Sequence, residues 1–231
     1  MDFKSISDDY RAVPFWSWNE KLDTAETARQ IHIMKNAGLG GYFMHARGGL
    51  QTKYMGEEWF ENVNVGVEEG KRLGMSAWAY DENGWPSGFG NGIVNGRGLA
   101  FQQKYLRFEK GEKQTDRTIC NKDGYHFYFD VNPFYCDTLN PDATDVFLKE
   151  IYEPYYNKYK NDIEGFFTDE PQISRNGIPW SFIMRDEYEK AYGEDLYERL
   201  IDLFENRDDC KNTRLKFWRL VTCLLYTSRT A

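Results

Sequence analysis

Two short segments of this sequence end in adjacent acidic residues, and these carboxylates are the side chains best suited to chemistry. One apolar run leads into Asp81 and Glu82, within YDENGWPSG, and another leads into Asp169 and Glu170, within FFTDEP. In barrel enzymes, the carboxyl ends of parallel strands carry the active-site residues. Hydrolysis of a glycosidic bond uses a pair of carboxylates that flank the bond. The sequence therefore predicts two acidic strand ends facing one cleft.

Within each acidic pair, the two side chains are expected to differ in role. Successive side chains of a strand point to opposite sides, so one acid should face the pocket while the other braces a loop or caps a turn. Glutamate has the longer reach, so we expect Glu82 and Glu170 to be catalytic, one as a general acid and the other as a base or nucleophile. Asp81 and Asp169 are then candidates for substrate binding.

Three more residues near these strand ends are candidates for substrate binding. His45 ends the expected second strand and Arg47 follows it, and Trp85 lies in YDENGWPSG, where its ring would form an aromatic platform. An arginine among carboxylates can hold a substrate hydroxyl or keep an acid ionised. The alternative for Arg47 is a structural ion pair with Asp81 or Asp169.

The first strand and the expected fourth strand add four further candidates. Trp16 and Trp18 lie two residues apart, so both rings point to the same face. They form either a stacking wall for a sugar or part of a barrel core. Asn19 ends the first strand and is suited to binding hydroxyl groups. Asp137 is either another inward carboxylate at a strand end or a turn residue.

Strands and helices alternate in the first ninety residues. Strands are expected over 12–18, 41–45 and 75–80, and helices over 24–37 and 57–73. Asp23 followed by Glu26 is a capping-box signature for the first helix, with Thr24 as the competing cap. This βαβαβ order predicts parallel strands joined by right-handed crossovers.

A β-rich insertion is expected over 89–133, after which the alternation resumes. The later elements are expected as strands over 134–139 and 165–168, a helix over 141–159, and helical segments over 185–205 and 215–225. The fold class predicted is α/β, of the (β/α)8 TIM-barrel type, with about five βα units where a closed barrel needs eight.

The expected organisation is an incomplete barrel. Residues 1–222 would form its N-terminal portion, and 223–231 would be a non-native or frayed tail. The alternative is an open five-stranded α/β domain with a frayed end.

The composition limits which classes of binding partner and which cellular compartment we expect. The net charge of −8 argues against nucleic acid or an anionic membrane as a partner. Aromatic residues make up 17% of the chain, which suits either sugar stacking or an aromatic-rich core. The four cysteines are widely spaced and the N-terminus has no apolar signal segment, so we expect reduced thiols and a cytoplasmic location. Three scattered histidines and the lack of an HExxH motif argue against a zinc site, and no metal ligands are assigned. A cation held by Asp and Asn oxygens stays open, because spacing does not reveal it.

Five segments, in order, resemble one enzyme family. PFWSWNEKL, MHARGGL, EEWF, YDENGWPSG and FFTDEP are similar to segments of the α-L-rhamnosidase-like glycoside hydrolases of family 106 and their uncharacterised relatives. The resemblance covers about residues 11–171. It implies a (β/α)8 catalytic barrel with appended β-sandwich domains, and calcium-assisted, inverting hydrolysis of terminal α-L-rhamnosides.

Carried over position by position, the resemblance implies that Glu82 and Glu170 lie in the active site, lined by His45, Arg47 and Trp85. It leaves a second possibility, in which the second catalytic carboxylate lies downstream of this sequence. One of the two glutamates would then be a substrate or cation ligand.

The prediction is therefore a fragment of a glycoside hydrolase that cleaves terminal sugars, such as α-L-rhamnosides, by carboxylate acid–base catalysis with inversion and requires no cofactor beyond the calcium that the resemblance implies. The 231-residue chain by itself is expected to be inactive. Two alternatives belong to other classes. A non-catalytic carbohydrate-binding protein would keep the aromatic residues without needing both glutamates close together. A metal-dependent sugar isomerase or aldolase would need a tight cluster of carboxylates and histidine around a cation.

Overall fold

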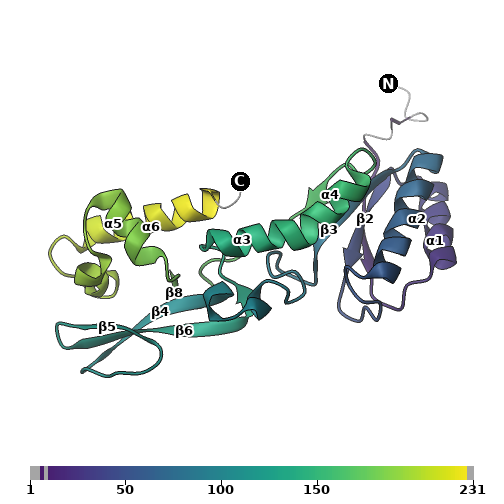
Figure 1. Ribbon diagram of the computed structural model, residues 1–231. Coiled ribbons are helices and arrows are strands. Elements are labelled where there is room, and N and C mark those ends of the chain that lie inside the picture. The colour runs from purple at the N-terminus through teal and green to yellow at the C-terminus, as the bar shows by residue number, and fades with distance from the viewer. Residues whose placement is uncertain (1–5, 8–9, 228–231) are drawn as a thin grey trace. The chain divides into compact units, whose positions relative to one another are not determined.

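The computed structural model describes residues 6–7 and 10–227, which form a mixed α/β structure of two compact units. The first unit comprises residues 1–91 and 148–171, and the second comprises 92–147 and 172–231. Figure 1 shows the elements of both units, each of which has its own sheet.

A parallel sheet of four strands forms the centre of the first unit. In spatial order it contains β1 (Phe15–Trp18), β2 (Gly41–Ala46), β3 (Ser76–Asn83) and β7 (Phe166–Phe167). These strands confirm the expected parallel βαβαβ pattern and the expected strand before TDEP. Within the described residues this sheet is open and does not close into a barrel.

The first two helices begin and end where local signals place them. α1 (Thr24–Asn36) starts after Asp23, whose carboxylate accepts the Glu26 N–H at 2.9 Å, so the predicted cap is confirmed. α2 (Glu57–Leu73) ends at Gly74, whose φ of 62° suits glycine. A third helix of this unit, α4 (Glu153–Tyr159), packs on α2 through the hydrogen bond from Trp59 Nε1 to Tyr155 Oη at 2.9 Å.

Helices cover one face of this sheet, and Figure 1 shows α1 and α2 together on that face. Trp18 points toward it, with its ring 5.0 Å from that of Trp59 in α2. The other face carries an aromatic cluster, in which Phe15 lies 5.2 Å from Phe43 and 4.8 Å from Phe167, measured between ring centroids. The alternation of side chains along β1 accounts for the two faces.

The end of β3 is irregular, and this irregularity positions the acidic residues. Its register against β2 runs regularly as far as Met44, opposite Ala79, and shifts before Ala46, which pairs with Asn83. The shift leaves extra β3 residues between the two pairs, as in a bulge. Tyr80, Asp81 and Glu82 lie in this stretch and the strand therefore bends where they emerge.

The second unit is built on an antiparallel sheet. Its strands, in spatial order, are β5 (Thr118–Lys122), β6 (Tyr125–Cys136), β4 (Gln102–Lys110) and β8 (Ile178–Trp180). Its helices are the 3-10 turns η2 (Asn95–Arg97) and η3 (Leu99–Phe101), then α3 (Pro141–Phe147), α5 (Met184–Tyr192), the 3-10 helix η5 (Leu196–Leu203) and α6 (Cys210–Thr227). The core between sheet and helices includes Leu106, Phe127, Tyr188 and Phe217. A π-helical turn, η4 (Leu148–Tyr152), precedes α4 in the first unit.

Of the later elements, the strand expected over 134–139 is wrong, and the helical stretch expected over 185–205 is confirmed but interrupted. No parallel strand forms over 134–139, because 134–136 extend β6, in which Cys136 pairs with Gln102 of β4. The helix expected over 185–205 is divided into α5 and η5, because Gly193 ends α5 with a φ of 67°.

The second unit also takes in more of the chain than the insertion expected over 89–133. It opens at Gly92, near the expected start, but extends to Phe147 and includes the chain from Gln172 onward. Residues 223–227 of the expected tail lie in α6, and 228–231 lie outside the described residues. None of the helices in the described part of the chain has both the length and the apolar character needed to cross a membrane.

Candidate active site

Asp81 is fully buried and bound by three hydroxyl groups. Its carboxylate accepts hydrogen bonds from Ser87 Oγ at 2.5 Å, Tyr152 Oη at 2.6 Å and Thr168 Oγ1 at 2.7 Å. Burial raises the pKa of Asp81, and the three hydroxyl groups oppose that rise. Asp81 therefore joins the β3 loop, the π-helical turn and the end of β7, and its oxygens are occupied by these partners.

Glu82 is also fully buried, and the loop that follows it wraps around its carboxylate. Five backbone N–H groups donate to it: Asn83 at 2.9 Å and Asn91 at 2.6 Å to Oε1, and Gly88 at 3.2 Å, Phe89 at 3.0 Å and Gly90 at 2.7 Å to Oε2. Burial raises the pKa of Glu82 to about 7, and the N–H groups of Asn91, Asn83 and Gly90 oppose this rise.

This arrangement makes Glu82 the organiser of its own loop. Both oxygens already accept at least two hydrogen bonds, so neither is directed at a substrate. Glu82 was expected to face the pocket, and this geometry does not support that role. The loop that it holds carries Trp85, whose side chain is 38% exposed.

Asp169 has one carboxylate oxygen that accepts a hydrogen bond and a second that can contact a substrate. Its Oδ2 accepts a hydrogen bond from Tyr80 Oη at 2.7 Å, and its side chain is half-buried. Among the described residues, no hydrogen bond is made to its other oxygen. The backbone N–H of Asp169 donates to Ser87 Oγ at 2.8 Å, and the Ser87 N–H donates to the Asp169 carbonyl at 2.8 Å. Ser87 thus fixes the ends of β3 and β7 to each other.

His45 lies against Tyr80, next to Asp169. Its ring stacks on Tyr80 with 3.5 Å between ring centroids, and the side chain is only 4% exposed. The backbone of Gly84 lies near the ring, but neither nitrogen meets the geometry of a hydrogen bond within the described residues. Burial lowers the pKa of His45 to about 4, and the positive charge of Arg47 lowers it further. The imidazole is therefore neutral at neutral pH, and it can donate to or accept from a ligand hydroxyl.

Glu170 is exposed and lies on a strained backbone. Its φ of 43° is in the left-handed region, which is unfavourable by about 1–2 kcal/mol for a residue with a Cβ. Such strain is often found at functional sites. The structure thus brings His45, Arg47 and Asp169 together around Tyr80, with Glu170 following Asp169 in the chain.

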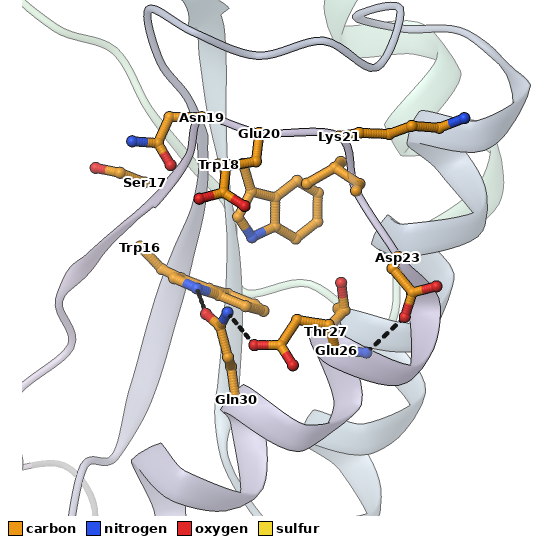
Figure 2. A pocket seen from close by; sticks show the side chains of 11 residues that line it. Trp16, Ser17, Trp18, Asn19, Glu20, Lys21, Asp23, Glu26, Thr27 and Gln30 are labelled. Carbon is orange, nitrogen blue, oxygen red and sulfur yellow. Dashed lines mark hydrogen bonds between the residues drawn. The ribbon is translucent and has the colours of Figure 1, made fainter.

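The remaining candidates lie elsewhere. Trp16, Trp18 and Asn19 line a pocket on the helix-covered side of the sheet, away from the aromatic face that carries Tyr80 (Figure 2). Asp137 belongs to the second unit, where its buried carboxylate pairs with Lys104 Nζ at 3.1 Å. The expectation for Asp137 relied on a strand over 134–139 that does not form.

The hydroxyl-bearing residues of the site were not among the candidates predicted from the sequence. Ser87 and Thr168 stand within the motifs YDENGWPSG and FFTDEP, so attention to every polar residue of those motifs would have found them. Tyr80 ends an expected strand, and its sequence context alone does not indicate a role in the site. Tyr152 has no local sequence signal, because its role depends on the contact between the π-helical turn and β3.

Across the described residues there is no group of three or more His, Cys, Asp or Glu side chains that could hold a metal ion. Calcium also takes backbone and amide oxygens as ligands, so the calcium that the sequence resemblance implies stays a prediction.

Comparisons with known proteins give one distant structural likeness. No family model matches the chain, and no curated protein matches it. A solved structure titled "Structure of Rhamnosidase from Novosphingobium sp. PP1Y" is similar over 51% of this chain, with 21% sequence identity and a TM-score of 0.39. The match covers 12% of that chain, so most of the neighbour lies outside the aligned region.

Proposed function

We propose that this chain forms one side of a glycoside hydrolase active site, on a sheet that is part of a (β/α)8 barrel. One observation carries the proposal: at the ends of adjacent parallel strands, the half-buried Asp169 carboxylate is held by Tyr80, beside the neutral ring of His45. Carboxylates at this end of a parallel sheet are in the position where barrel enzymes carry out catalysis.

Asp169 is the proposed base of the reaction. Its Oδ2 accepts the hydrogen bond from Tyr80, and the carboxylate takes a proton from water. The water oxygen then attacks the anomeric carbon, and the bond from this carbon to the leaving oxygen breaks. Glu170 is the proposed general acid and gives a proton to that oxygen. The reaction leaves Asp169 protonated and Glu170 ionised, and exchange with solvent restores both.

Other residues would bind and orient the sugar. His45 and Arg47 supply hydrogen-bonding groups for its hydroxyls, and Trp85 supplies an exposed ring for stacking. Glu82 is a positioning residue here, because it holds the loop that carries Trp85. This assignment replaces the expected pair of Glu82 and Glu170 with Asp169 and Glu170.

The substrate class follows from charge and from the sequence motifs. A chain with a net charge of −8 and a site rich in carboxylates disfavours anionic sugars. The resemblance of YDENGWPSG and MHARGGL to the rhamnosidase-like family makes a terminal α-L-rhamnoside the first substrate to test.

The test is hydrolysis of 4-nitrophenyl α-L-rhamnopyranoside, with other aryl glycosides alongside, by the protein that carries this sequence. Asp169→Asn and Glu170→Gln should each lower kcat by about 10²–10⁴. Glu61→Gln, an exposed acid on α2, is the matched control and should leave kcat unchanged. Wild-type activity in both site variants would overturn the assignment.

A non-catalytic carbohydrate-binding protein is the second candidate. It is favoured by the fully hydrogen-bonded state of Asp81 and Glu82, which leaves fewer free carboxylates than a hydrolase with four strand-end acids would have. Saturable binding of a sugar without turnover of any aryl glycoside would select this candidate.

A further inference from the structure

Asp81 is a buried acid beside the candidate active site, and the proposed reaction does not use it. Its side chain is fully buried, so it cannot contact a substrate. Its carboxylate is bound by hydroxyl groups from three segments of the first unit, which are Ser87 in the loop after β3, Tyr152 in η4 and Thr168 directly after β7. Any part that Asp81 plays in the reaction must therefore act through these partners.

Two of the three partners connect Asp81 to Asp169. The Ser87 hydroxyl donates its one proton to Asp81, so the lone pairs of Ser87 Oγ remain to accept the Asp169 N–H, at 2.8 Å. Thr168 precedes Asp169 in the chain, and its hydroxyl donates to Asp81 at 2.7 Å. Asp81 thus holds the residue before the proposed base and, through Ser87, the backbone of the base itself.

Tyr152 fixes the same carboxylate from the helical side. Its hydroxyl donates to Asp81 Oδ2 at 2.6 Å, and its ring lies 4.3 Å from that of Phe166 in β7, measured between centroids. Phe166 also contacts Tyr155, at 5.4 Å between ring centroids, and the buried Tyr155 hydroxyl accepts from Trp59. Tyr152 is therefore pinned beside β7 by its ring as well as by its hydroxyl. It ends a π-helical turn, an element often found at functional sites.

The carboxylate of Asp169 depends on this framework for its direction. Within the described part of the chain its side chain accepts one hydrogen bond, from Tyr80. The backbone at 168–169 therefore decides where the second oxygen points. Misplacing a reacting group by about 1 Å can lower a rate about a hundredfold. A loosened backbone here should thus lower kcat more than it weakens substrate binding.

We propose that Asp81 and Tyr152 are positioning residues for Asp169, and that they aim its carboxylate at the attacking water. They act through the Thr168 hydroxyl and through Ser87. The inference rests on the proposed role of Asp169 as the base. It gives Asp81 a role different from the substrate binding that the sequence predicted.

The experiment is hydrolysis of 4-nitrophenyl α-L-rhamnopyranoside by the protein that carries this sequence, with kcat and KM measured separately. Tyr152→Phe removes only the hydroxyl and keeps the ring on Phe166. It should lower kcat about tenfold and leave KM within about twofold of the wild type. Tyr156→Phe, an exposed tyrosine of α4, is the matched control and should leave both constants unchanged.

Variants of Thr168 separate positioning from a general loss of stability. Thr168→Val has nearly the shape of threonine without the hydroxyl, so kcat should fall about tenfold. Thr168→Ser keeps the hydroxyl that binds Asp81, and its kcat should stay within about twofold of the wild type. Wild-type kcat in Tyr152→Phe, or an equal loss of kcat in Thr168→Ser and Thr168→Val, would overturn the proposal.

Exchange of the Asp169 amide distinguishes this inference from the proposed function. In the 15N-labelled 231-residue chain, Thr168→Val and Tyr152→Phe should each exchange this amide about threefold to tenfold faster, and Tyr156→Phe at the wild-type rate. Absence of hydrolysis by the wild type, with faster exchange in both variants, would reject the catalytic role of Asp169 and keep the framework around it. An unchanged exchange rate in both variants would overturn the positioning role, even where Asp169→Asn abolishes hydrolysis.

Discussion

Replacing Ser87 by alanine tests the framework that holds the strand ends together. The change removes the hydrogen bond from Ser87 Oγ to the Asp81 carboxyl and deprives the Asp169 N–H of its acceptor. A hydrogen bond to a charged group contributes about 1.5–3 kcal/mol, and an unsatisfied buried donor costs about 1–3 kcal/mol. Because Asp81 keeps its bonds to Tyr152 and Thr168, we expect a loss near the lower end, about 3 kcal/mol.

Amide hydrogen exchange measures this effect locally. A loss of about 3 kcal/mol corresponds to exchange of the Asp169 amide about a hundredfold faster in Ser87→Ala than in the wild type. Ser17→Ala, an exposed serine on β1, is the matched control and should exchange as the wild type does at this amide. An unchanged Asp169 exchange rate in Ser87→Ala would refute the view that Ser87 joins β3 and β7.

Two further predictions concern buried charge. In His45→Phe, the fall in unfolding free energy between pH 6.5 and 4 should be smaller by up to about 3 kcal/mol, as measured by urea unfolding across this range. In the folded wild type the pKa of His45 is about 4, below the unfolded value of about 6.5. The neutral ring therefore contributes stability above pH 6.5 that is lost as the pH falls toward 4. Identical dependence of the unfolding free energy on pH in the wild type and His45→Phe would contradict this prediction. In Asp137→Asn, Lys104 keeps a buried charge without its anionic partner, so thermal and urea unfolding should show a loss of about 3–5 kcal/mol. An apolar replacement of both partners, Lys104→Met with Asp137→Leu, should recover much of this loss, and failure of Asp137→Asn to lower the stability would show that the pair contributes little.

Local signals were enough to predict the parallel half of the fold. The cap at Asp23, the stop at Gly74 and the short apolar runs of β1, β2 and β3 each act over a few residues, so the sequence alone could locate them. The run over 134–136 was misassigned because its apolar character suits a strand in either sheet. Its pairing with β4, more than thirty residues earlier in the chain, decides the outcome.

The roles of the acids depended on tertiary contacts. Alternation along β3 correctly suggested that one acid of a pair braces a loop, but Asp81 and Glu82 both have bracing contacts. The register shift at the end of β3 and the wrapping of residues 83–91 around Glu82 produce this result, and neither is visible in a single segment. For Trp16 and Trp18, the spacing predicted a shared face but not that this face is turned toward the helices.

The most direct test of the central claim is kcat for Asp169→Asn on an aryl α-L-rhamnoside, measured together with Tm. An asparagine Oδ1 can still accept the hydrogen bond from Tyr80, so the fold should be kept and Tm should change by only a few degrees. We predict a kcat lowered by about 10²–10⁴ in a protein of nearly unchanged stability. A folded Asp169→Asn variant with the kcat of the wild type would contradict the proposed function of this carboxylate.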